Sequence, residues 1–206
     1  VDKPGTLVPE DADIRLAERP LYVSRGGIKL AHALDAFGID VTSLAALDIG
    51  ASTGGFTDCL LQRGARRVYA VDVGYGQIDY RLRTDPRVVM MERLNARHPF
   101  SLPEPVDLVT VDVSFISVEM VLPNAAALLK PGGVIIVLVK PQFEAGREQV
   151  GKGGIVRDPQ VHAQVLGRFI SWAVAQGLRF GGLVASPIAG AEGNREFLAL
   201  LRKGTE

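Results

Sequence analysis

The chain has 206 residues, of which 47% are hydrophobic and 22% are charged, and this composition excludes a disordered or fibrous protein. Its 23 basic and 23 acidic residues cancel, which excludes a uniformly basic nucleic-acid binder but not a local basic face. The longest aliphatic run, residues 134–139, is far shorter than the roughly 20 residues that span a bilayer. We therefore expect a globular protein without a membrane segment.

The first twenty residues differ in character from the rest of the chain. They are rich in turn-forming residues, such as Pro4, Gly5 and Pro9, and show no helical period. We interpret residues 1–20 as a tail, or as the last hairpin of a module whose beginning is absent.

From Ser24 onward, helix-like and strand-like segments alternate, which favours a doubly wound α/β sheet. The last two expected strands follow each other without a helix, which predicts an antiparallel edge on a mostly parallel seven-stranded sheet. The Pro-Gly-Gly of residues 131–133 is expected to form a turn that stops the helix before it. The expected helices cover residues 26–37, 55–62, 118–129 and 159–176; the expected strands cover residues 45–49, 67–72, 88–91, 106–113, 134–139, 180–186 and 196–201.

The one cysteine of the chain, Cys59, lies in an apolar segment and cannot form an internal disulfide. We therefore expect a buried structural thiol in a protein of the reducing cytoplasm. A domain of this length needs neither a disulfide nor a metal ion to fold, and we expect no metal site.

A glycine-rich turn joins the first expected strand to the helix after it. Gly50, Gly54 and Gly55 allow the backbone to approach a ligand closely, and their spacing differs from that of dinucleotide-binding enzymes. Asp72 ends the second strand, where a carboxylate can accept hydrogen bonds from both ribose hydroxyls of an adenosine. Together these features resemble the S-adenosylmethionine (SAM) site of Rossmann-like methyltransferases. The alternative is a turn that serves only in packing.

Four charged residues elsewhere in the chain are candidates for a functional site when they are considered together. Asp112 and Lys140 each follow an expected strand, so both could face the ligand crevice at the carboxyl edge of the sheet. Lys29 and Glu196, taken singly, are typical of solvated surface charges.

The segments around these four residues resemble the TlyA family, once labelled hemolysins, which belongs to the FtsJ-like ribosomal RNA ribose 2′-O-methyltransferases. Four motifs carry the resemblance in the right order, in residues 22–30, 112–117, 139–144 and 193–197. The resemblance implies a Rossmann-like SAM-dependent methyltransferase fold for residues 21–206. It also places Lys29, Asp112, Lys140 and Glu196 on the positions of that group's Lys-Asp-Lys-Glu catalytic tetrad.

The chemistry of ribose methylation accounts for these residue types. A ribose 2′-hydroxyl must lose its proton as it attacks the methyl group, and Lys140 in its neutral form could take that proton. Asp112 would orient Lys140, while Lys29 and Glu196 would position the ribose. This division of roles is a hypothesis.

The resemblance also implies contacts to SAM and to RNA. Asp72 would bind the ribose, and Asn95 would contact the adenine edge. The full set expected to hold SAM is Asp48, Gly50, Ser52, Gly54, Gly55, Phe56, Asp72, Val73, Asn95 and Asp112; the set expected to contact RNA is Arg25, Arg147, Lys152 and Arg157.

The expected partner is ribosomal RNA or a ribosomal subunit. Family members carry a small RNA-binding domain before the catalytic one, and we interpret residues 1–20 as its remnant, so we expect weak RNA binding by this chain. The alternatives are a membrane-active hemolysin, a SAM-binding protein without turnover, and an NAD-dependent oxidoreductase. The sequence leaves the target nucleotide, the ribosomal subunit and the oligomeric state open.

Overall fold

The structure, a computed structural model, describes residues 7, 9 and 20–205. Most of the predicted N-terminal remnant, residues 1–20, therefore lies outside the described residues. Within the described part, no helix is both long enough and apolar enough to cross a membrane. The strands are β1 (Ala45–Ile49), β2 (Arg67–Val71), β3 (Val88–Met91), β4 (Val106–Val111), β5 (Leu129–Val139), β6 (Arg179–Ala185) and β7 (Phe197–Arg202).

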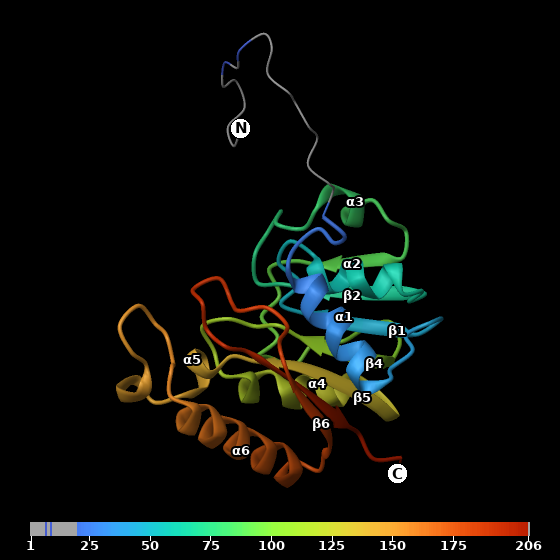
Figure 1. Cartoon of the computed structure of the whole chain (residues 1–206). Coiled ribbons are helices and arrows are strands. Elements are labelled where there is room, and N and C mark those ends of the chain that lie inside the picture. The colour runs from blue at the N-terminus through green and yellow to red at the C-terminus, as the bar shows by residue number, and fades with distance from the viewer. Residues whose placement is uncertain (1–6, 8, 10–19, 206) are drawn as a thin grey trace.

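These strands form one sheet in the order β3-β2-β1-β4-β5-β7-β6 (Figure 1). β1 to β5 pair in parallel, whereas β7 runs antiparallel to both of its neighbours, β5 and β6. The prediction of a mostly parallel seven-stranded sheet with an antiparallel edge is confirmed. The chain reverses its direction of strand addition between β1 and β4, which is the place where doubly wound folds bind ligands.

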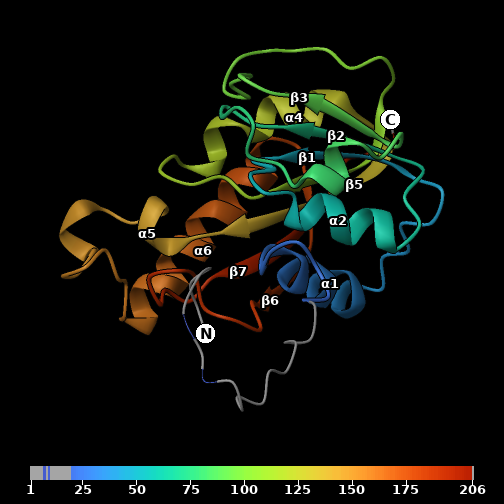
Figure 2. The same cartoon turned by 90° about the horizontal axis from the view of Figure 1, so that it is seen from above.

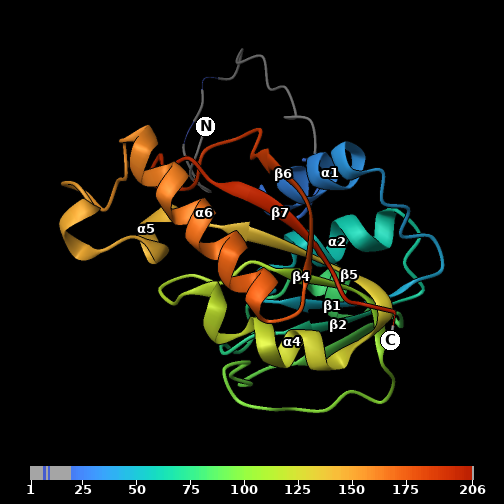
Figure 3. The same ribbon diagram turned by 90° about the horizontal axis from the view of Figure 1, so that it is seen from below.

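Helices cover both faces of the sheet. α1 and α2 pack on one face with α3, and α4 and α6 pack on the other. Figure 2 is seen from the side of α1 and α2, and Figure 3 from the side of α4 and α6. The helices are α1 (Gly26–Phe37), α2 (Gly55–Gln62), α3 (Tyr80–Arg83), α4 (Leu122–Leu128), α5 (Pro141–Glu144) and α6 (Pro159–Ala175), with 3-10 turns η1 (Val118–Met120) and η2 (Arg147–Gln149).

The start of α6 follows the predicted capping pattern. The Asp158 side chain accepts a hydrogen bond from the backbone N–H of Gln160, and Pro159 occupies the first turn.

The region between β4 and β5 differs from the prediction. The single helix expected over residues 118–129 is divided into η1 and α4, because Pro123 lacks an N–H and belongs in the first turn of a helix. The expected stop at residues 131–133 lies inside β5, which begins at Leu129. The pairing of β5 with β4 is irregular there, between Val106 and Leu108.

β5 is apolar throughout its second half because both of its faces are buried. Ile135, Val137 and Val139 belong to the core cluster under α4 and α6. The intervening residues, Ile136 and Leu138 among them, belong to the cluster under α1 and α2. This alternation fixes the register of β5, because a slip of one residue would exchange the two faces.

Asp48 is a charged residue that lies within the core, away from the cavities of the sheet edge. Asp48 of β1 is fully buried, and its carboxylate accepts hydrogen bonds from Thr57 Oγ1 at 2.7 Å and Thr110 Oγ1 at 3.0 Å. It thereby connects β1 with α2 and β4. Burial raises the pKa of Asp48 from its ordinary value of 3.8 to about 6, and the two threonine hydroxyls oppose this rise only in part.

Replacing Asp48 by Asn tests the cost of this buried charge. The folded-state pKa is raised, so the carboxyl's contribution to stability is present at low pH and lost as the pH rises through about 6. As the pH rises from below 3.8 to above about 6, the free energy of unfolding of the wild type should therefore fall by about 3 kcal/mol relative to that of D48N. Urea unfolding of both proteins from about pH 4 to about pH 8 measures the effect. A difference that does not vary with pH would contradict it.

Candidate active site

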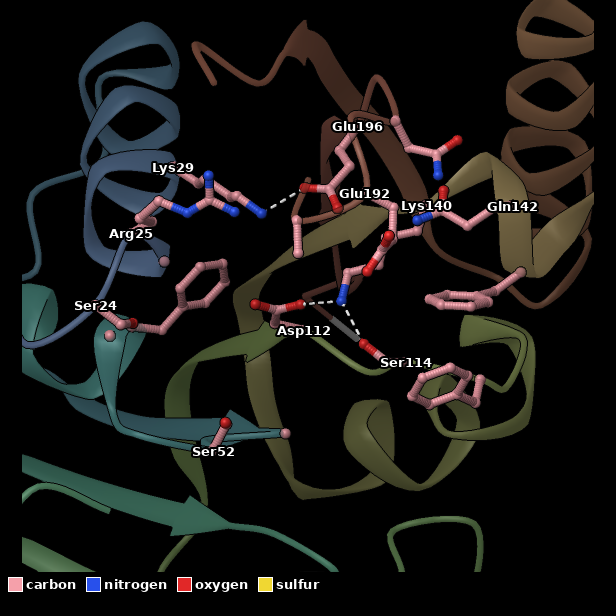
Figure 4. A pocket seen from close by; sticks show the side chains of 18 of the residues that line it. Ser24, Arg25, Lys29, Ser52, Asp112, Ser114, Lys140, Gln142, Glu192 and Glu196 are labelled. Atoms are coloured by element: carbon pink, nitrogen blue, oxygen red, sulfur yellow. Dashed lines mark hydrogen bonds and ion pairs between the residues drawn. The ribbon is translucent and has the colours of Figure 1, made fainter. Parts of the chain in front are cut away.

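Two adjoining cavities lie at the carboxyl edge of the sheet. The larger, of about 860 Å³, lies among the ends of β1, β4 and β5, the first turn of α1 and the segment before β7 (Figure 4). The smaller, of about 360 Å³, lies beside the ends of β1, β2 and β4. Both are bordered by Gly50, Ser52, Asp112, Ser114 and Phe115, so they share one wall.

The glycine-rich turn after β1 separates the cavities and is held tightly. Gly50 has φ +84°, and a Cβ atom there would lie 2.3 Å from the carbonyl oxygen of Asp112. Glycine is therefore required at this position. Gly55 and Phe56 border the larger cavity. Gly54 borders neither cavity, since its Cβ position is filled by Leu82 of α3.

The smaller cavity contains the acid at the end of β2. Asp72 accepts hydrogen bonds from the backbone N–H of Ser52 at 2.8 Å and of Gly74 at 2.7 Å, one on each carboxylate oxygen. Each oxygen keeps a free lone pair for a ligand hydroxyl. Val73 and Asn95, also predicted to contact the cofactor, border the same cavity. Asp48, which was predicted with them, is buried in the core and borders neither cavity.

The four residues of the predicted tetrad all border the larger cavity, where they form two ion pairs (Figure 4). Lys140 Nζ lies 2.7 Å from Asp112 Oδ1, and Lys29 Nζ lies 2.5 Å from Glu196 Oε2. Lys29, Lys140 and Glu196 are each buried. Each ammonium is thus matched by one carboxylate, as buried charges require.

The strand register explains this meeting of distant residues. Asp112 and Lys140 directly follow the neighbouring parallel strands β4 and β5. Glu196 directly precedes β7, whose first residue, Phe197, pairs with Val139, the last residue of β5. The three side chains therefore reach the same edge of the sheet, and α1 supplies Lys29 from the side.

Lys140 has a further contact that the sequence did not indicate. Its ammonium donates a hydrogen bond to Ser114 Oγ at 2.7 Å, whereas its contact with Asp112 Oδ1 is close but lacks hydrogen-bond geometry. The only available signal was the position of Ser114 two residues beyond Asp112. Gln142 and Phe143 were missed as well, although both border the cavity, and the Phe143 ring lies 5.1 Å from that of the exposed Phe115.

The residues predicted to contact RNA fall into two groups. Arg25 borders the larger cavity, next to Lys29. Arg147, Lys152 and Arg157 are exposed on the glycine-rich loop and do not border it, although Gly153 and Gly154 of the same loop do. Among the described residues, no group of three or more His, Cys, Asp or Glu side chains is placed to hold a metal ion.

Comparison with solved structures and characterised sequences gives a consistent result. A Bacillus subtilis protein, YqxC, is 54% identical over 96% of this chain and 72% of its own length. The Mycobacterium tuberculosis 16S/23S rRNA (cytidine-2′-O)-methyltransferase TlyA is 47% identical over 99% of this chain and 78% of its own length. A Streptococcus thermophilus structure that carries a hemolysin label has 49% identity and a TM-score of 0.85, covering 92% of this chain and 70% of that one.

The profile of the FtsJ-like methyltransferases matches residues 22–203, which include both cavities and all four charged residues. The fold, with its seven-stranded sheet and its glycine-rich turn, is the one that the resemblance implied. The match excludes the oxidoreductase alternative, in agreement with the glycine spacing. This chain belongs to the FtsJ-like methyltransferase family.

Proposed function

We propose that this protein transfers a methyl group from SAM to a ribose 2′-hydroxyl of ribosomal RNA. The observation that carries the proposal is the placement of Lys140 Nζ, within 2.7 Å of both Asp112 and Ser114, in a cavity that adjoins the Asp72 cavity. The name of the M. tuberculosis relative, a cytidine-2′-O-methyltransferase of ribosomal RNA, supports this substrate class. The reaction would then take place in the cytoplasm, on ribosomal RNA or a ribosomal subunit.

The residues of the smaller cavity fit SAM. Asp72 offers a carboxylate with a free lone pair on each oxygen, and Gly50 leaves room for close approach of the ligand. Ser52, Val73 and Asn95 complete the proposed contacts. When bound, SAM supplies an electrophilic methyl group on a positively charged sulfur.

The larger cavity would hold the ribose acceptor. A hydroxyl of the ribose is a weak nucleophile, so its proton must leave as its oxygen forms the new bond to the methyl carbon. Lys140 Nζ would accept that proton after its ammonium has released one to solvent, and the ammonium formed again in this step would be stabilised by the charge of Asp112 and by a hydrogen bond to Ser114. Because one side chain is held by two neighbours, its nitrogen is oriented before the substrate arrives.

The Lys29–Glu196 pair borders the same cavity, beside the Lys140–Asp112 pair (Figure 4). We assign it to positioning the ribose, since an ammonium donates and a carboxylate accepts hydrogen bonds from sugar hydroxyls. Arg25 at the cavity border, and Arg147, Lys152 and Arg157 on the exposed loop, supply positive charge for the RNA phosphates.

Replacing Lys140 by Ala should remove the proton acceptor without altering the SAM site. We expect kcat to fall by about 10²–10⁴-fold, with the Kd for SAM near that of the wild type. Steady-state methylation assays and calorimetric SAM titration measure the two quantities. Lys130→Ala is the matched control, because Lys130 pairs with Asp107 near the other end of β5. A K140A protein with wild-type kcat would exclude Lys140 from the reaction.

Replacing Asp72 by Asn should weaken SAM binding, whereas K140A is expected to leave it near that of the wild type. The substitution removes the negative charge that would accept hydrogen bonds from the ribose hydroxyls. It also places the amide NH₂ of Asn against one of the two backbone N–H groups that donate to Asp72, so that this N–H loses its acceptor. We expect SAM to bind about 10- to 100-fold more weakly, as for a lost hydrogen bond to a charged group. Asp85→Asn is the control, since Asp85 pairs with Arg87 away from both cavities. Unchanged SAM affinity in D72N, measured by calorimetry, would place the cofactor elsewhere.

The substrate itself can be identified by methylation of ribosomal subunits. Purified small and large subunits that lack the modification are incubated with this chain and labelled SAM, and the RNA is digested to nucleosides for mass spectrometry. We expect 2′-O-methylcytidine as the labelled product. Label on a base, or no label in either subunit while SAM binds normally, would contradict the proposed function.

A further inference from the structure

Glu144, the last residue of α5, joins three segments around the larger cavity without bordering it. Its carboxylate accepts hydrogen bonds from Ser117 Oγ at 2.7 Å and from the backbone N–H of Val118 at 2.8 Å. Its backbone carbonyl accepts a hydrogen bond from the guanidinium of Arg168 in α6. Glu144 therefore fastens the segment after β4 to the segment after β5.

These bonds close a ring that contains the Lys140 ammonium. The chain runs from Lys140 through α5 to Glu144, crosses by hydrogen bond to Ser117, returns along the chain to Ser114, and crosses again to Lys140 Nζ. Figure 4 shows the last of these contacts, between Ser114 and Lys140. Both neighbours of the ammonium, Ser114 and Asp112, lie on the segment whose far end Glu144 holds.

The segment between Asp112 and Ser117 needs such a support. Phe115 has φ +66°, a left-handed conformation that is strained for a non-glycine residue. The Phe115 side chain is 87% exposed, so burial of its ring does little to offset this strain. A packing contact with Phe143 and the two hydrogen bonds to Glu144 hold the turn from the α5 side.

We propose that Glu144 is a positioning residue, which sets the places of Ser114 and Asp112 about Lys140 Nζ and so the rate of methyl transfer. The proposal rests on the proposed function. Glu144 acts through the segment from Asp112 to Ser117 and does not touch either substrate. Its effect is therefore expected on kcat and not on SAM affinity.

The chemistry of the contacts distinguishes two substitutions. A Gln at this position keeps both bonds, since its oxygen accepts from the Val118 N–H and its amide donates to the Ser117 hydroxyl, which can accept. An Ala removes both bonds. Burial raises the pKa of the Glu144 carboxyl, and the hydrogen bonds from Val118 and Ser117 oppose this rise.

The test compares E144A, E144Q and the control E148A, whose acid is exposed in the next turn. Steady-state methylation of the ribosomal subunit that takes label from SAM gives kcat, normalised to the number of SAM sites found by calorimetry. We expect E144A to lose about 10- to 100-fold in kcat with unchanged Kd for SAM, because small misplacements of reacting groups cost about this much. E144Q and E148A should stay within about threefold of the wild type.

Ser117→Ala keeps the test informative if E144A does not fold. It removes one of the two bonds to Glu144 and also the cap that Ser117 Oγ gives the Glu119 N–H, so S117A should lose kcat even where Glu144 is intact. The E144A/S117A double variant should lose less than the two single losses combined, since both changes remove the Glu144–Ser117 contact. A wild-type kcat in E144A, an equal loss in E144Q and E144A, or a parallel loss of SAM affinity would overturn the proposal.

A spectroscopic measurement separates this proposal from the proposed function. In protein labelled with ¹³C-lysine, the ε-methylene signal of Lys140 is assigned by its absence in K140A. It should shift in E144A and remain in place in E144Q and E148A. If the wild type methylates no RNA, the proposed function fails, but the Lys140 signal still reports whether Glu144 positions Lys140. An unmoved Lys140 signal in E144A would overturn this role of Glu144.

Discussion

The placement of the site depends on the pairing of β5 with β4 on one side and with β7 on the other. β5 buries apolar side chains on both faces, and each large one stabilises the fold by about 1.5–3 kcal/mol. This burial allows one register only, and the register determines that Asp112, Lys140 and Glu196 reach the same edge. Residues that lie far apart in the sequence thus meet because packing fixes the strand register.

The charges of the site are balanced before any ligand binds. Two buried lysines each have one carboxylate partner, and an ammonium left unpaired at such a depth would cost several kcal/mol. The zero net charge of the chain therefore says little about its affinity for RNA. The exposed arginines and the lysine of the glycine-rich loop lie outside this balanced centre.

The sequence predicted the fold well and indicated that four distant charged residues would meet in one cavity, because both leave local signals. Strand and helix periods located the elements, and the glycine turn, the acid after β2 and the four motifs located the cavities. Ser114 and Glu144 left no comparable signal, since their importance arises from contacts across the sheet edge. The stop expected at residues 131–133 was wrong because tertiary pairing with β4 overrides the turn preference of Pro-Gly-Gly. Asp48 shows the same limit: its place beside the turn suggested a ligand contact, but its side chain faces the core.

The proposed reaction requires that Lys140 Nζ meet the ribose 2′-oxygen that receives the methyl group. A structure of this chain with the demethylated cofactor product and a bound ribosomal RNA substrate would show this contact. We expect one ribose in the larger cavity, with its 2′-oxygen within about 2.6–3.2 Å of Lys140 Nζ. A ribose held elsewhere, or a base atom in that position while Lys140 contacts only Asp112 and Ser114, would contradict it.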